Sequence, residues 1–188
     1  MYYNKATMKK ILAFGASNSK TSINKKLAHF AVSFFEEPAQ TLIDLNDFEL
    51  PLFGVDLEAE IGPPDNAVRF SNLLEAHDGL IISLAEHNSN FTAVFKNLGD
   101  WVSRLGGPTW KNKKTFLLST SNGGRGGKSA MDIALNILPY RGMDIKAHFS
   151  LPFFSENFKE PDGITDPELL KEFKEQLDKF KASLSDDH

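Results

Sequence analysis

Three stretches of the chain concentrate residue types that bind ligands, and each follows a short run of apolar residues. Residues 17–24 carry hydroxyl and amide groups, residues 86–90 carry a carboxylate, an imidazole and amides, and residues 119–127 include four glycines. Hydroxyls, side-chain amides and main-chain N–H groups can hold a phosphate, and glycines let the backbone approach a flat ligand closely. These residue types are compatible with a mononucleotide site.

Each stretch also has a simpler interpretation, which the residues alone leave open. Ser and Thr before a helix are favoured because they cap its first N–H groups, so residues 17–24 could serve only that purpose. The glycines could form a flexible connector, and His87 could be an exposed loop residue without a role. Two other nucleotide sites are disfavoured, because the chain lacks G-x-x-x-x-G-K-[ST] and has no G-x-G-x-x-G after its first strand.

The spacing of apolar residues predicts the elements that would position these stretches. Strands are expected near residues 9–15, 41–45, 79–85, 115–119 and 143–154, and helices near 25–37, 66–76, 91–104, 129–138 and from 166 onward. Such alternation predicts a parallel sheet covered by helices on both faces, with the polar stretches at its carboxyl edge. Residues 46–64 are expected to be an irregular connection with solvated acidic side chains.

Length and composition restrict the classes of function. A chain of 188 residues is expected to form a single domain over 1–188, with residues 1–7 as a disordered leader. Without cysteine, any redox activity must come from a bound cofactor. The net charge of -4 argues against nucleic acid as a partner. The chain has neither a membrane-spanning apolar run nor a secretory signal, so a cytoplasmic location is expected; histidine spacing indicates no metal.

The three stretches resemble the flavodoxin-like NAD(P)H-dependent FMN reductases, a family that includes quinone and chromate reductases. The family patterns are G-S-x-R-x-x-S-x-N-x-x-L-A and P-E-Y-N-x-S-x-x-x-x-L-K-N-x-x-D-W, followed by a glycine-rich segment after the fourth strand. The matching residues are Ser17, Ser22, Asn24, Leu27, Ala28, Glu86, Asn88, Lys96, Asn97, Asp100 and Trp101. The resemblance implies a flavodoxin-like three-layer sandwich whose five-stranded parallel sheet has the order 2-1-3-4-5.

The resemblance also implies FMN as cofactor, NADPH or NADH as co-substrate, a small-molecule electron acceptor, and a homodimer or homotetramer. The residues that it places at FMN are Ser17, Ser19, Ser22, Ile23, Asn24, Ala85, Glu86, His87, Asn88, Ser119, Asn122, Gly123 and Gly124. No side chain is assigned as a nucleophile, because hydride passes from nicotinamide to flavin. The His87 imidazole could stack on the ring or donate a proton to a reduced quinone. Lys96, Asp100 and Trp101 are expected to be structural, the first two as an ion pair.

Several positions depart from the family pattern. Ser19 stands where the family has Arg, so a charge-assisted phosphate contact is missing, and Lys20 is a candidate substitute. Ala85 and His87 replace Pro and Tyr, which changes the surface expected beside the flavin ring.

Three functions follow from these observations. The leading hypothesis is an oxidoreductase that passes electrons from NAD(P)H through FMN to a quinone, a flavin, or an azo or metal-oxyanion compound. The alternatives are a flavin-binding electron carrier or redox-responsive interaction protein without its own small substrate, and a cofactor-free binding module that keeps the fold.

Overall fold

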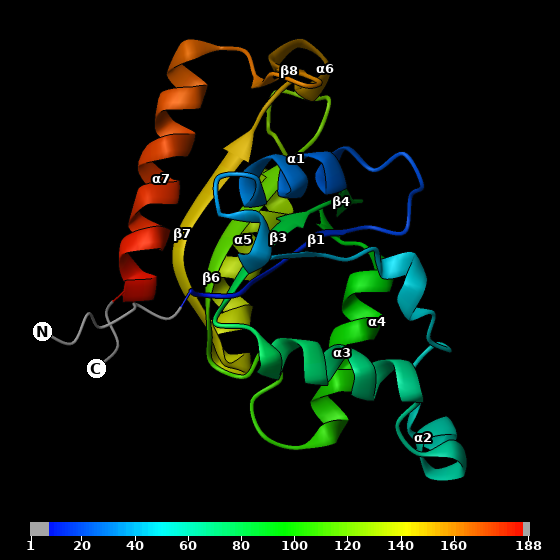
Figure 1. The fold of residues 1–188 in the computed structure, drawn as a ribbon. Coiled ribbons are helices and arrows are strands. Elements are labelled where there is room, and N and C mark those ends of the chain that lie inside the picture. Colours follow the sequence, from blue (N-terminus) through cyan, green and yellow to red (C-terminus); the bar gives the residue numbers. More distant parts are fainter. Residues whose placement is uncertain (1–7, 186–188) are drawn as a thin grey trace, which may run out of the picture.

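The computed structural model describes residues 8–185 and confirms the predicted fold (Figure 1). A five-stranded sheet has the order β2-β1-β3-β6-β7, and every neighbouring pair is parallel. This is the predicted order 2-1-3-4-5. The expected leader, residues 1–7, lies outside the described residues. The strands of this sheet are β1 (Ile11–Ala16), β2 (Gln40–Leu42), β3 (Gly79–Leu84), β6 (Lys113–Thr120) and β7 (Met143–Leu151).

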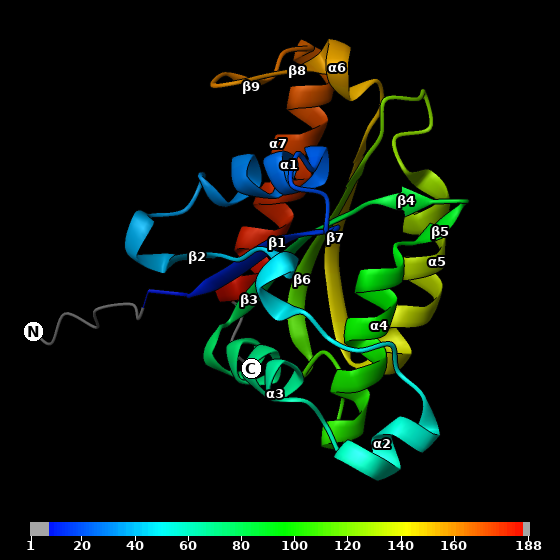
Figure 2. The same ribbon diagram turned by 90° about the vertical axis from the view of Figure 1, so that its right-hand side faces the viewer.

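Helices cover both faces of the sheet, and Figure 2 shows α1 and α7 on one side and α4 and α5 on the other. Successive β1 side chains point to opposite faces, so Leu12 and Phe14 pack with α3, α4 and α5, whereas Ile11 and Ala13 pack with α1 and α7. The helices and 3-10 helices are α1 (Ile23–Val32), η1 (Glu37–Ala39), η2 (Leu45–Phe48), α2 (Val55–Ile61), α3 (Asp65–Ala76), α4 (Ala93–Val102), η3 (Ser103–Leu105), α5 (Lys128–Ile137), η4 (Leu138–Arg141), α6 (Phe154–Asn157) and α7 (Pro167–Ser185).

Residues 46–64 are more ordered than predicted. They contain most of η2 and the whole of α2, and α4 holds the segment before α2 in place. The Asn97 side chain accepts from the Phe53 N–H at 2.8 Å and donates to the Pro51 carbonyl at 2.9 Å; the indole N–H of Trp101 donates to the same carbonyl at 2.7 Å. Glu58, expected in a solvated face, pairs with Arg104 at 2.6 Å.

The structural roles expected along α4 are confirmed. Lys96 and Asp100 form an ion pair in which Nζ lies 2.6 Å from Oδ1, and Trp101 is fully buried. Two small antiparallel pairs were not expected. They are β4 (Glu86–His87) with β5 (Asn90–Phe91), and β8 (Phe158–Lys159) with β9 (Gly163–Ile164). The first pair converts the expected open loop after β3 into a hairpin.

Within residues 8–185, no helix is long and apolar enough to cross a membrane. The same residues contain no group of three or more His, Cys, Asp or Glu side chains arranged to hold a metal ion.

Candidate functional site

Buried hydrogen bonds connect the carboxyl ends of β1, β3 and β6. The Asn24 side chain, in the first turn of α1, links two strands: its Oδ1 accepts from the Ser83 hydroxyl at 2.7 Å and from the Thr120 N–H at 3.1 Å. Its Nδ2 donates to the Thr120 carbonyl at 3.1 Å. The Thr92 hydroxyl, at the start of α4, donates to the Ala16 carbonyl at 2.8 Å. The three strand ends therefore form one edge whose internal geometry is fixed by side chains.

Loop 1, defined as residues 17–22, joins β1 to α1. Ser22 caps the helix, because its Oγ accepts from the Lys25 N–H at 3.1 Å, and the Ser17 Oγ accepts from the Ser19 N–H at 3.1 Å. A hydroxyl that accepts one hydrogen bond can still donate another, so capping and anion binding do not exclude each other. Lys20 and Thr21 are exposed at the top of the loop.

The start of α1 lies directly against the end of β1. A Cβ atom on Gly15 would come within 2.5 Å of the Lys25 backbone nitrogen, so only glycine allows this approach. The first turn of α1 contains no acidic residue, and the leading N–H groups of a helix have no acceptor within it. This end of the helix therefore favours a negatively charged ligand group.

The hairpin, residues 86–91, is held to the start of α5 by one carboxylate. Oε2 of Glu86 accepts from the Ser129 N–H at 2.9 Å and from the Ala130 N–H at 3.2 Å. The helix needs this contact because its own N-cap residue, Gly127, has no side chain. At the tip of the hairpin Asn88 has a φ of 50°, and both it and His87 are exposed.

The glycine loop, residues 121–127, forms a hydrogen-bonded turn. The Gly123 carbonyl accepts from the N–H groups of Gly126 and Phe153, and the Ser119 hydroxyl donates to the Gly126 carbonyl at 2.8 Å. Gly126 has a φ of +58°, and a Cβ there would lie 2.9 Å from the Leu151 backbone. The loop is therefore bonded to the segment that follows β7.

The structure separates the candidate residues into two groups. One group is buried or partly buried and mainly holds the edge together: Ser17, Ser22, Ile23, Asn24, Ala85, Glu86 and Ser119. The other is exposed at the edge and can meet a ligand: Ser19, His87, Asn88, Asn122, Gly123 and Gly124. The sequence did not reveal Ser83, Thr92 or Thr120 as structural members of the site. Thr92 carried a visible signal, a Thr immediately before a helical apolar pattern, but its bond to Ala16 depends on the fold.

Charge at the base of loop 1 is balanced within the chain. Lys25 pairs with Asp44, which follows β2. Burial raises the pKa of Asp44, whereas hydrogen bonds from Lys25 and Asn46 lower it. The lowering effect is larger, so this pKa lies below its ordinary value of 3.8. The exposed Lys20 is not part of this pair.

Comparison with known proteins agrees with this geometry. The family model described as NADPH-dependent FMN reductase matches residues 9–154. The chain belongs to the NADPH-dependent FMN reductase family. Membership makes it an oxidoreductase that uses FMN and NAD(P)H, and its residues fit that cofactor: α1 begins at an anion-favouring end, and glycine backbone lies at the same sheet edge.

Individual proteins similar to this FMN reductase family member are also named as reductases or oxidoreductases. A probable NADPH:quinone oxidoreductase of Oryza sativa subsp. japonica is 25% identical over 182 residues, covering 92% of this chain and 87% of the rice protein. An NAD(P)H-dependent FMN reductase of Pseudomonas aeruginosa is 30% identical over 115 residues, covering 61% of this chain and 60% of its own. The solved structure of FerB, a flavoenzyme NAD(P)H:(acceptor) oxidoreductase from Paracoccus denitrificans, has a TM-score of 0.76 at 24% identity, covering 94% of this chain and 97% of FerB. The structural likeness supports the fold.

Proposed function

We propose that this family member passes two electrons from NADPH or NADH through FMN to a small acceptor, with a quinone as the first candidate. The observation that carries the proposal is the edge formed by β1, β3 and β6, where buried bonds align an anion-favouring helix start with exposed groups of the hairpin and the glycine loop. The rice relative, named as a probable NADPH:quinone oxidoreductase, supports a quinone as acceptor.

In this proposal loop 1 holds the FMN phosphate, with hydroxyls of Ser17, Ser19 and Ser22, N–H groups at the start of α1, and Lys20 in place of the missing Arg. The hairpin and the glycine loop would hold the ring, through Ala85 to Asn88 on one side and Asn122 to Gly124 on the other. Bound FMN accepts hydride from a nicotinamide and returns electrons to an acceptor. The residues of the chain hold the nicotinamide and the acceptor in reactive positions at the flavin and exclude unreactive ones.

His87 is proposed as the proton donor to the reduced acceptor. Its imidazole is exposed on the hairpin, within the group of residues assigned to the ring. A proton donor affects only the half-reaction in which the acceptor is reduced. His87→Asn should therefore lower kcat with a quinone by at least tenfold, while anaerobic bleaching of bound FMN by NADH keeps its rate.

We expect a homodimer or homotetramer. Apolar side chains on α2 support this expectation, because Val55 is 70% exposed and Ile61 is 50% exposed. Light scattering of the purified protein tests it, and a monomeric mass at all concentrations would remove this part of the proposal.

The experiment that tests the function is an absorption spectrum before and after addition of FMN, followed by NADH and NADPH oxidation assays with a quinone, an azo dye and a metal oxyanion. A flavin spectrum together with turnover of a small acceptor supports the proposal. FMN binding without such turnover would instead favour an electron carrier, and a protein that cannot bind FMN would contradict both.

A further inference from the structure

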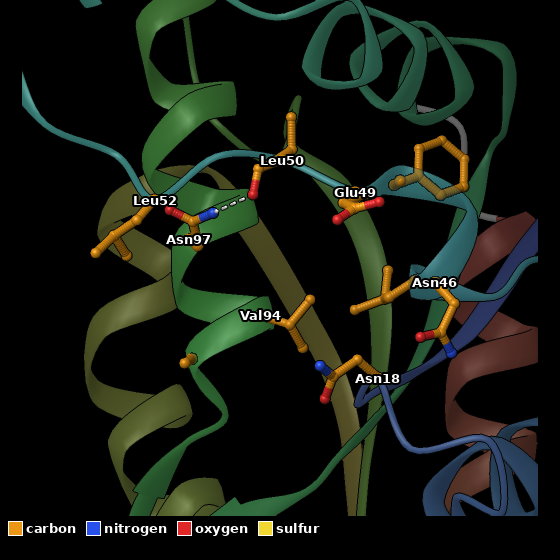
Figure 3. Close-up of a pocket in the computed structure, with 10 residues that line it drawn as sticks. Asn18, Asn46, Glu49, Leu50, Leu52, Val94 and Asn97 are labelled. Carbon is orange, nitrogen blue, oxygen red and sulfur yellow. Dashed lines mark hydrogen bonds between the residues drawn. The ribbon is translucent and has the colours of Figure 1, made fainter. Parts of the chain in front are cut away.

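A pocket that the proposed FMN contacts do not use lies beside loop 1 (Figure 3). Its volume is about 460 Å³, within the range of small-molecule sites. Asn18 of loop 1 forms one side, the segment 45–52 forms a second, and the first turns of α4 form a third. The pocket therefore adjoins the candidate site through loop 1 and through the residues that follow Thr92.

The walls of this pocket are partly apolar and held in place. Phe48, 4% exposed, belongs to the core, and Val94 on α4 packs against the same core. Asn97 has its amide fully engaged with the backbone at Pro51 and Phe53, so it fixes the wall and is not free for a ligand. Leu52, 81% exposed, stands at the rim, where a bound molecule would cover it.

Polar groups without partners remain in the pocket. Across the described part of the chain, residues 8–185, the Asn18 amide and the Glu49 carboxylate form no side-chain hydrogen bond or ion pair. The Asn46 Nδ2 donates to Asp44 at 2.8 Å, which leaves its Oδ1 able to accept. The pocket thus offers two or more acceptors, of which one is charged, and one amide that can both donate and accept.

This combination selects the chemistry of the occupant. None of the lining residues is cationic, and Arg69, which lies 4.0 Å over the Phe48 ring centroid, donates to Asn66. The Glu49 carboxylate then disfavours a phosphate or a carboxylic acid beside it. An aromatic heterocycle with an exocyclic amine fits best, because the amine can donate to Glu49, a ring nitrogen can accept from Asn18, and apolar side chains can cover the ring face. Adenine has these groups, and the family's NAD(P)H carries an adenine ring.

We propose that this pocket binds the adenine ring of the nicotinamide dinucleotide. The inference rests on the use of NAD(P)H as electron donor, and it does not depend on which acceptor is reduced. It assigns Asn18 and Glu49 to recognition of the co-substrate, and it places the dinucleotide across loop 1, between the pocket and the exposed edge at the hairpin.

The first test compares NADH with reduced nicotinamide mononucleotide, which lacks the adenosine part. Glu49→Ala should raise the KM for NADH about tenfold, the usual effect of losing a hydrogen bond to a charged group, while the mononucleotide keeps its KM. Val94→Phe, which fills the pocket, should act in the same direction. Glu60→Ala is the matched control, because it removes an exposed carboxylate on α2 outside the pocket. The readout is the rate of anaerobic bleaching of bound FMN, measured over a series of NADH concentrations; it requires no acceptor.

The second test needs no flavin and therefore separates failure of this inference from failure of the proposed function. Adenosine 5′-monophosphate is titrated into the protein without FMN while ¹⁵N NMR follows the side-chain amides of Asn18 and Asn46. The proposal is supported if the NMR signals of both amides shift. The affinity for adenosine 5′-monophosphate should then be about tenfold weaker in Glu49→Ala and unchanged in Glu60→Ala. Absence of binding would overturn it, as would binding combined with unchanged NADH KM in the variants. A pocket covered by a second copy would show as no nucleotide binding and a lower oligomer mass for Val94→Phe.

Discussion

The most direct test of the site's architecture is removal of the Asn24 side chain. In Asn24→Ala, three groups lose their partner: the Ser83 hydroxyl, which is fully buried, and the N–H and carbonyl of Thr120, which is 1% exposed. Each buried polar group left unpaired costs about 1–3 kcal/mol. Some relaxation and water entry reduce the sum, so we expect a loss of about 3–5 kcal/mol, a large part of a typical domain stability.

Urea denaturation of the protein without FMN, followed by circular dichroism, measures this loss. Asn18→Ala is the control, since its side chain is exposed and makes no hydrogen bond within the described chain, and it should stay within about 0.5 kcal/mol of the unmodified protein. The double variant Asn24→Ala with Ser83→Ala should be less destabilised than the sum of the single variants, because it leaves no orphaned hydroxyl. A loss below about 1 kcal/mol for Asn24→Ala would refute the reasoning.

Backbone strain, one ion pair and one phosphate contact can each be tested by a single substitution. Gly126→Ala should lower stability by more than about 1 kcal/mol in thermal melts, because φ is +58° and the new methyl would meet backbone; Gly54→Ala, with open space around it, should change little. The pKa of Asp44 is lowered in the folded state, so its pairing with Lys25 stabilises the protein above the unfolded pKa and is lost as the pH falls through the folded pKa. Asp44→Asn should therefore be less stable than the unmodified protein at pH 7, and urea titrations should show the difference disappearing on acidification below pH 3.8. Lys20→Ala should weaken FMN binding about threefold to tenfold while riboflavin, which lacks the phosphate, keeps its affinity in fluorescence titrations; equal weakening of both would contradict a phosphate contact.

Local patterns were sufficient to predict the order of the elements along the chain, because the buried strands are apolar runs and the helices between them have apolar residues at helical spacing. The strand order 2-1-3-4-5 came from the resemblance to the FMN reductase family, and the structure confirms it. Residues 46–64 were predicted wrongly as irregular because α2 buries no residue and so lacks an amphipathic signal. The order of that segment comes from Asn97 and Trp101, which lie almost fifty residues further along the chain.

The site was predicted less completely than the fold. Sequence placed the three polar stretches at one sheet edge, where they lie in the structure, but it could not tell which of their side chains are exposed there. Glu86 shows the difficulty, because its carboxylate caps α5 across 43 positions of sequence, and nothing near Glu86 or Ser129 indicates that pairing. The pocket beside loop 1 was also not predicted, because Asn18, Glu49 and Val94 belong to three separate segments.

The division between inward and outward residues at the sheet edge has a consequence for protein engineering. The hydrogen bonds of Asn24, Thr92 and Ser119, the last of them to Ser150, join the strand ends without using the side chains of His87, Asn88 or Asn122. A saturation library at His87 should therefore retain a folded scaffold in most clones, whereas Asn88, with a φ of 50°, and Asn122, whose Oδ1 accepts from the Ser155 hydroxyl at 2.7 Å, should tolerate fewer side chains. Changes of acceptor preference can then be sought there without compensating mutations elsewhere in the molecule.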